Sequence, residues 1–238
     1  MTYVNEELPV LFVVGTDTDV GKTVLSLLLM QFFFRHGRCP FYLKPVQTGC
    51  SDPYDVDSDA RFIYRHVEAM QHKDPAESVL YCFRNPKAPL MAARDEGKTI
   101  DVKRIENVVA ERKRSSDPVI VEAAGGVLVP VTEEILVADL VYRLDASPII
   151  AARAGLGTIN HTLLTVEALE KRGVRPLGIV LIDAGEKETE AEMIRENMEA
   201  IERISGVAVS GVIRRFGDFS HPPEESDQPL IKLFSKEV

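Results

Sequence analysis

A strand, a glycine-bounded loop and a helix follow one another near the start of this 238-residue chain. Residues 9–14 are continuously apolar, as in a buried strand, and residues 23–35 are mostly helix formers. Between them, residues 15–23 read Gly-Thr-Asp-Thr-Asp-Val-Gly-Lys-Thr. In such a loop, backbone N–H groups face an anion, the lysine reaches the outer phosphates and the threonine hydroxyl holds Mg²⁺. The sequence therefore predicts a nucleotide phosphate site, although Thr16 stands where the strict pattern has glycine.

Further short apolar runs alternate with helical patterns along almost the whole chain. The runs lie at residues 39–43, 118–121, 148–152, 177–182 and 207–213. Continuous apolar runs are typical of strands buried on both faces of a parallel sheet. We therefore predict an α/β fold of the P-loop NTPase kind, a doubly wound and mostly parallel sheet with helices on both faces. We expect one domain over residues 1–238, with mobile parts at residues 51–57 and after residue 216.

Composition excludes several classes of protein. The formal net charge of -9 argues against a basic face for nucleic acid, so no nucleic-acid partner is expected. No apolar run approaches the roughly 18 residues of a membrane span, and the N-terminus lacks a secretory pattern. Three cysteines, Cys39, Cys50 and Cys82, are too scattered for a disulfide framework or a zinc site. We expect a cytoplasmic protein with no membrane partner.

Polar residues follow two of the apolar runs. These positions correspond to the carboxyl ends of strands, where an open α/β sheet binds its ligands. Lys44 comes at the end of the run that begins at residue 39, and Glu122 follows the run that ends at residue 121. A carboxylate at such a position is a usual Mg²⁺ ligand in phosphoryl transfer. Structural alternatives are a lysine whose ammonium reaches the rim of the sheet and an acid that caps a turn. A further carboxylate is expected from Asp55, Asp57 or Asp59, among which spacing alone does not choose.

Another loop of interest follows the run at residues 148–152. Gly155 and Gly157 open a helical segment there, with Asn160 and His161 one turn further on. Backbone N–H groups at a helix N-terminus are suited to bind a carboxylate. His161 alone is more typical of a packing histidine than of a catalyst.

Taken together, these segments resemble the dethiobiotin synthetase family. The resemblance is carried by five motifs in the family's order, which are residues 15–23, Lys-Pro-Val-Gln-Thr-Gly at 44–49, Ser-Asp-Ala at 58–60, Glu-Ala-Ala-Gly-Gly at 122–126 and Gly-Leu-Gly-Thr-Ile-Asn-His at 155–161. Residues 88–93, Ala-Pro-Leu-Met-Ala-Ala, add a weaker match. Each motif alone is moderately specific, whereas all five in order are a strong signal.

The resemblance implies an ATP- and Mg²⁺-dependent ring-closing ligase of biotin biosynthesis. Its substrates would be 7,8-diaminononanoate and CO₂, and its product dethiobiotin. One amine would capture CO₂ as a carbamate, and ATP would phosphorylate that carbamate. The second amine would then attack the carbamic-phosphoric anhydride and expel phosphate. Positioning and charge neutralisation carry most of such a phosphoryl transfer.

The resemblance also implies roles for individual residues. Lys22 and Lys44 would be catalytic, and Thr23, Asp59 and Glu122 would hold Mg²⁺. The nucleotide would be bound by Asp19, Val20, Gly21, Lys22, Thr23, Val24, Asp59, Glu122, Ala123, Ala124, Gly125 and Asp183. The substrate would be bound by Thr18, Thr48, Gly157, Thr158 and Asn160. The last three would come from the neighbouring subunit, so a homodimer is expected.

The chain departs from the family near the expected base site. Many relatives have an Asn-Asp pair where this chain has Ile182 and Asp183. Isoleucine cannot donate to or accept from a base edge. We therefore predict weaker discrimination between ATP and other nucleoside triphosphates than in relatives that carry the asparagine.

Two other readings of the phosphate loop remain. A related P-loop ligase that activates a carboxylate is one, although cobyrinate a,c-diamide synthases usually carry an additional glutaminase domain. A partitioning or division-type switch ATPase is the other. Those proteins carry a second lysine where this chain has Asp17, and they often end in a basic amphipathic helix. Here residues 222–225 read Pro-Pro-Glu-Glu, which disfavours the switch ATPase.

Overall fold

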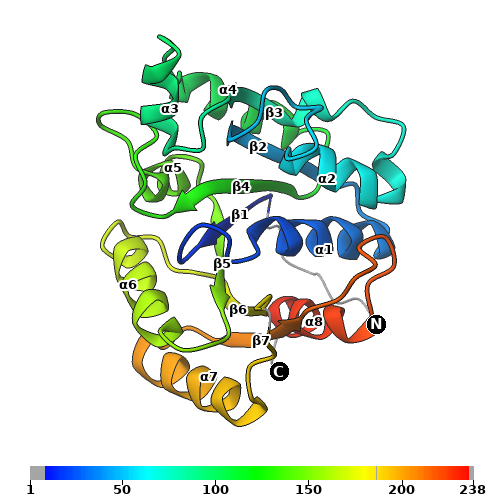
Figure 1. Ribbon diagram of the computed structural model, residues 1–238, viewed down its shortest axis with the longest axis vertical. Coiled ribbons are helices and arrows are strands. Elements are labelled where there is room, and N and C mark those ends of the chain that lie inside the picture. Colours follow the sequence, from blue (N-terminus) through cyan, green and yellow to red (C-terminus); the bar gives the residue numbers. More distant parts are fainter. Residues whose placement is uncertain (1–8, 186, 236–238) are drawn as a thin grey trace.

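Seven strands form one parallel sheet in the computed structural model, which describes residues 9–185 and 187–235 (Figure 1). The sheet order is β3-β2-β4-β1-β5-β6-β7. The strands are β1 (Val10–Gly15), β2 (Phe41–Thr48), β3 (Val79–Phe83), β4 (Val119–Gly126), β5 (Ser147–Arg153), β6 (Gly178–Asp183) and β7 (Val209–Arg214). The strand order reverses beside β1, so β1 and β4 diverge toward the loops that follow them, where α/β sheets bind ligands.

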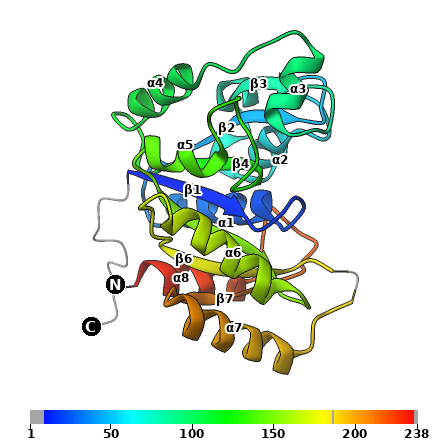
Figure 2. The same cartoon turned by 90° about the vertical axis from the view of Figure 1, so that its left-hand side faces the viewer.

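Helices cover both faces of the sheet. They are α1 (Lys22–Arg35), α2 (Asp59–His66), α3 (Pro89–Asp95), α4 (Val102–Arg112), α5 (Val137–Arg143), α6 (Thr158–Glu170), α7 (Ala191–Ser205) and α8 (Gln228–Phe234), with short 3₁₀ turns η1 (Glu68–Met70), η2 (Pro75–Ser78) and η3 (Glu224–Asp227). Helices α1, α2 and α8 share one apolar core with the sheet, and α3 to α7 share the other. Figure 2 shows α5, α6 and α7 in front of the strands. The predicted fold class is therefore confirmed.

Strand boundaries differ from the sequence prediction in ways that matter for the site. Both β2 and β4 extend past their apolar runs, so Lys44 and Glu122 lie within strands and not after them. Strand β3 was not expected from the sequence, and most of its side chains are half-buried. An edge strand of this kind lacks the continuous apolar run of a central strand.

The segment after Phe216 is not the mobile tail that its prolines suggest. It forms η3 and α8, and Leu230 and Phe234 are buried against α1 and the sheet. The Phe234 ring stacks on Phe32 at a centroid distance of 5.7 Å and meets Phe33 edge-on at 5.2 Å. This contact explains why α1 is apolar nearly all round, since it is covered by the sheet on one side and by α8 on another.

Two further outcomes concern composition. No helix of the described residues is long and apolar enough to cross a membrane. The three cysteines are free thiols, and those at positions 50 and 82 are not scattered in space, because their sulfur atoms lie 3.2 Å apart. Cys50 follows β2 and Cys82 lies on β3. Sequence spacing could not show this, because it depends on the pairing of the missed strand.

Candidate active site

The phosphate-binding loop joins the carboxyl end of β1 to the first turn of α1. Gly21 precedes the helix with a φ of 93°, a left-handed conformation that suits glycine. No side chain caps the helix, and its first turn contains no acidic residue. The backbone N–H groups at the start of α1 are therefore available to an anionic ligand.

Lys22 begins α1 and points back along the loop. Its side chain is buried, and Nζ donates to the carbonyl oxygen of Asp17 at 2.8 Å. Burial, followed by the charge of Lys44, lowers the pKa of Lys22 from 10.5 to about 8. Arrival of a phosphate group would favour the protonated ammonium and raise this pKa again.

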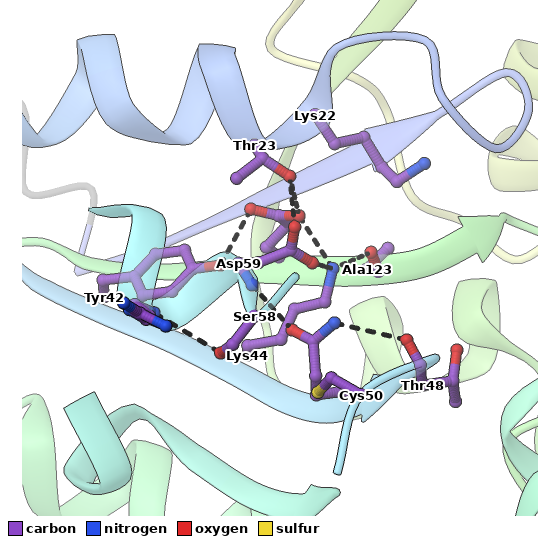
Figure 3. Close-up of polar contacts among 12 residues, drawn as sticks. Lys22, Thr23, Tyr42, Lys44, Thr48, Cys50, Ser58, Asp59 and Ala123 are labelled. Carbon is purple, nitrogen blue, oxygen red and sulfur yellow. Dashed lines mark hydrogen bonds and ion pairs between the residues drawn. The ribbon is translucent and has the colours of Figure 1, made fainter. Parts of the chain in front are cut away.

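Lys44 lies on β2 at the centre of a buried ionic cluster (Figure 3). Its Nζ is 2.7 Å from Asp59 Oδ2 and 2.7 Å from Glu122 Oε1. It also donates to the carbonyl oxygen of Ala123 at 3.1 Å. Lys44 is 4 % exposed and Glu122 is 1 % exposed. One ammonium thus bridges two carboxylates beneath the phosphate-binding loop.

The charges in this cluster stabilise one another. Burial by itself lowers the pKa of Lys44, but the charges and hydrogen bonds of Asp59 and Glu122 outweigh burial and raise it. Burial raises the pKa of Asp59, yet the ion pair with Lys44 dominates and lowers it overall. Both Lys44 and Asp59 are therefore ionised at neutral pH.

Thr23 completes the cluster from α1. Its Oγ1 lies 2.9 Å from Asp59 Oδ1 and 2.9 Å from Glu122 Oε1. Ser58 caps α2 by accepting a hydrogen bond from the backbone of Arg61, which places Asp59 in the first turn of that helix. Oxygen atoms from α1, α2 and β4 consequently face a common point.

This set of oxygens fits Mg²⁺. The ion prefers hard oxygen ligands and is commonly held by one or two carboxylates together with substrate phosphates and water. Asp59 and Glu122 supply two carboxylates, and the hydroxyl of Thr23 lies within hydrogen-bond distance of both. Within residues 9–185 and 187–235, no group of three or more His, Cys, Asp or Glu side chains could hold a metal. The site therefore suits an ion shared with a nucleotide better than one caged by protein.

Comparison with known proteins identifies the family. A family model described as an AAA domain matches residues 10–222. The chain is 40% identical over 174 residues to the ATP-dependent dethiobiotin synthetase BioD of Hydrogenobaculum sp. (strain Y04AAS1), covering 72% of this chain and 76% of the relative. It is 41% identical over 203 residues to the BioD of Paramagnetospirillum magneticum (strain ATCC 700264 / AMB-1), covering 85% of this chain and 86% of the relative. The chain belongs to the dethiobiotin synthetase family.

Solved structures support the fold of this dethiobiotin synthetase family member. The MinC:MinD cell division protein complex of Aquifex aeolicus matches with a TM-score of 0.57, covering 94% of this chain and 93% of that chain. The two sequences are 17% identical, so the likeness concerns the fold alone. The predicted P-loop NTPase architecture is confirmed, and the resemblance to the synthetase family is confirmed by the relatives.

Most of the predicted site residues line one cavity of about 610 Å³ next to the phosphate-binding loop. From the predicted sets, its lining includes Thr18, Asp19, Gly21, Lys22, Thr23, Val24, Lys44, Thr48, Asp59, Glu122, Ala124 and Gly125. Val20 and Ala123 are buried beside it. Of the three acids that spacing could not separate, Asp59 joins the ionic cluster, Asp57 lies on the cavity wall, and Asp55 caps a turn through Ser51.

Asp183 lies away from this cavity, in a second one of about 530 Å³. The second cavity shares Val24 and Ala184 with the first and is also lined by Ile182 and Phe216. The Asp183 carboxylate accepts hydrogen bonds from the backbone and hydroxyl of Thr189 at 3.0 and 2.8 Å. In this family member, therefore, both carboxylate oxygens of Asp183 already have protein partners.

The predicted substrate residues on the loop before α6 are not brought to the cavity of their own chain. Gly157 and Asn160 are exposed, and Thr158 is buried with its hydroxyl 3.3 Å from that of Thr162. None of the three lines either large cavity. Gly157 has a φ of 90° and directly precedes α6, whose start has no side-chain cap.

Two polar residues near the cluster were not foreseen. Tyr42 donates its buried hydroxyl to Glu122 Oε2 at 2.9 Å, and burial raises the pKa of Tyr42 well above its usual value. Gln47 accepts a hydrogen bond from the backbone N–H of Asp59 at 3.2 Å. Tyr42 could have been found by strand parity, because it shares with Lys44 the side of β2 that faces α1 and α2.

Proposed function

We propose that this protein closes the ureido ring of dethiobiotin from 7,8-diaminononanoate, CO₂ and ATP. Support comes from family membership and above all from one observation, the ammonium of Lys44 held between two carboxylates beside Lys22 and the phosphate-binding loop. A carbamate is an anion that must meet another anion, the terminal phosphate of ATP. Two lysines at one cavity neutralise that repulsion.

In this proposal each charged residue has a defined task. Lys22 binds the outer phosphates and the carbamate, and leaves its resting contact with the Asp17 carbonyl to do so. Lys44 stabilises the carbamate anion and the phosphoryl group in transit, because its pKa keeps it charged. Thr18 and Thr48, which line the same cavity, orient the diamine or its carbamate. The second amine then attacks the carbamic-phosphoric anhydride, and phosphate leaves.

We assign Mg²⁺ binding to Thr23, Asp59 and Glu122. When bound, the ion neutralises phosphate charge and orients the terminal phosphate of the nucleotide. Lys44 meanwhile neutralises both carboxylates, which lie next to the Thr23 hydroxyl. We also propose that residues 1–238 form one domain, that the protein acts in the cytoplasm, and that a second subunit supplies Gly157, Thr158 and Asn160 to bind the substrate carboxylate.

Mass spectrometry provides the direct test. Purified protein is incubated with Mg-ATP, ¹³C-labelled bicarbonate and 7,8-diaminononanoate, and the product is examined for labelled dethiobiotin. Labelled product that requires ATP is the expected result. Absence of product, with Mg-ATP still bound by calorimetry, would overturn the substrate assignment while leaving the phosphate site in place.

A further inference from the structure

The two oxygens of the Glu122 carboxylate have different partners. Oε1 faces the cation-binding side, where Thr23 Oγ1 lies at 2.9 Å and Lys44 Nζ at 2.7 Å. Oε2 faces away and accepts a hydrogen bond from the hydroxyl of Tyr42 at 2.9 Å. Thr23, Lys44 and Glu122 line the cavity next to the phosphate-binding loop, and Tyr42 lies behind them. Tyr42 is 0 % and Glu122 1 % exposed.

We propose that Tyr42 is a positioning residue for the divalent cation, acting through Glu122. Its hydroxyl fixes the plane of the carboxylate so that Oε1 points at Thr23 and Asp59. This inference rests on the proposed function, because it takes Glu122 as a Mg²⁺ ligand. It adds to that function a residue which does not touch nucleotide, substrate or metal.

The contacts of Thr23 and Lys44 hold only one of the two carboxylate oxygens of Glu122. The terminal torsion of glutamate is broad, so the plane of the carboxylate turns easily about its last bond. Thr23 and Lys44 both contact Oε1, so they hold one of the two carboxylate oxygens. The Tyr42 hydroxyl is bonded to Oε2, so it holds the second oxygen and restrains the plane of the carboxylate from its other side. Hydrogen-bond partners of metal ligands commonly have this orienting effect.

The backbone of Tyr42 is itself tied to the helix that supplies the other carboxylate. Ser78 donates its hydroxyl to the Tyr42 carbonyl oxygen at 2.6 Å, and the Tyr64 hydroxyl lies 2.9 Å from Ser78 Oγ. Tyr64 belongs to α2, whose first residue is Asp59. One buried chain of hydrogen bonds therefore connects the elements that position Asp59 and Glu122.

Packing alone does not account for the hydroxyl. The ring of Tyr42 fills the core shared with α1 and α2, and a phenylalanine ring would fill the same space. A fully buried hydroxyl is favourable only where it finds a partner. Its partner among the described side chains is the carboxylate of Glu122, which gains a charge-assisted hydrogen bond.

Tyr42→Phe tests the inference. Mg²⁺ is titrated by calorimetry into protein saturated with a non-hydrolysable ATP analogue, and the Mg²⁺ dependence of turnover is measured at saturating substrates. We expect about 10-fold weaker Mg²⁺ binding, the lower end of the usual range for such partners. Turnover at saturating Mg²⁺ should stay close to that of the unaltered protein. Tyr64→Phe is the matched control, because it removes a hydroxyl from the same buried chain without touching Glu122.

Glu122→Gln separates this inference from the function on which it rests. If Glu122→Gln weakens Mg²⁺ binding and Tyr42→Phe does not, the positioning role of Tyr42 is overturned and the metal site stands. If Glu122→Gln leaves Mg²⁺ binding unchanged, the metal assignment itself is overturned. Tyr42→Met, a second variant without the hydroxyl, guards against misfolding of Tyr42→Phe, and wild-type Mg²⁺ affinity in either folded variant contradicts the proposal. An equal loss of Mg²⁺ affinity in Tyr64→Phe would also contradict it.

Discussion

Lys22 has a buried ammonium group, which donates a hydrogen bond to a backbone carbonyl in the absence of a ligand. Its pKa of about 8 in the free protein reflects burial and the neighbouring charge of Lys44. Triphosphate would bring negative charge against it and raise that pKa toward its ordinary value of 10.5. At a pH between about 8 and 10.5, Lys22 is mostly deprotonated in the free protein and mostly protonated in the complex. Nucleotide binding should therefore take up a proton in that interval.

Calorimetry measures this uptake. At about pH 8.5, just above the lowered pKa, ATP binding in buffers of different ionisation enthalpy should show uptake of about three-quarters of a proton. Lys22→Arg keeps a cation that does not titrate, so uptake should disappear in that variant. Equal proton uptake in the unaltered protein and in Lys22→Arg would show that a group other than Lys22 titrates.

Lys44 carries the largest expected effect of any single residue. In Lys44→Ala the carbamate and the moving phosphoryl group lose a preorganised cation, so turnover should fall by at least ~10²- to 10³-fold. The fold should persist, because Mg²⁺ can still neutralise Asp59 and Glu122. Steady-state kinetics with circular dichroism checks both statements. A near-normal kcat would refute the role assigned to Lys44.

The charged residues of the site could be predicted from the sequence, but the residues that surround them could not. Lys44 and Glu122 stand out because charge interrupts an apolar strand. Asp59 needed the family resemblance, since Asp55 and Asp57 are as close in sequence. The place of Tyr42 on the same side of β2 as Lys44 could have been found by strand parity, but its contact with Glu122 joins distant segments and could not. The pairing of Asp183 with Thr189 depends on the loop after β6 and could not be foreseen either.

Among the elements, the carboxyl end of β6 sets the environment expected for the base. Ile182 packs against the phosphate-binding loop so closely that a Cβ on Gly21 would lie 2.7 Å from its Cδ1. The adjoining cavity is lined largely by apolar and aromatic side chains such as Ile213, Phe216 and Phe219, together with Arg214 and Arg215. Asp183 is engaged with Thr189. Stacking and van der Waals packing would thus make up most of the side-chain contacts with the base, and Arg214 and Arg215 are the hydrogen-bond donors on the same wall.

Weak base selectivity is the resulting prediction. Saturation kinetics with ATP, GTP and CTP should give kcat/KM values within about tenfold of one another, since apolar contact discriminates poorly between planar rings. Ile182→Asn should shift the preference toward ATP. A strong preference for ATP in the unaltered protein would contradict this prediction.

Helix α8 is an element whose importance the sequence concealed. Its Pro-rich approach suggested a loose tail, yet Phe234 is buried against Phe32 and Phe33. Phe234→Ala should lower the free energy of unfolding by about 3 kcal/mol, the usual cost of deleting a buried ring. Gln228→Ala, at an exposed position of the same helix, should change it by less than about 0.5 kcal/mol. Urea denaturation compares the two, and equal stabilities would show that α8 contributes little.

For the molecule as a whole, alternation of strand and helix was enough to predict the fold class, because parallel central strands leave continuous apolar runs. The edge strand β3 and the packed helix α8 were missed, since half-buried strands and short helices leave weak patterns. The position of the site at the carboxyl ends of the strands could also be predicted, because parallel sheets bind ligands where the strand order reverses, here beside β1. What sequence cannot convey is which loops of one chain close which cavity.

The loop before α6 is the segment for which the sequence leaves open whether it completes the cavity of its own chain or that of a second subunit. Gly157, Thr158 and Asn160 do not line the large cavities of their own chain, so a shared site between two subunits predicts complementation. Asn160→Asp, which places a negative charge near the substrate carboxylate, and Lys44→Ala should each be nearly inactive at low substrate. Co-expressed, they should recover about a quarter of wild-type activity, because half of the dimers would be mixed and each would hold one intact site. Co-purification with two different tags verifies the mixing, and activity no higher than that of the separate variants would place every site within a single chain.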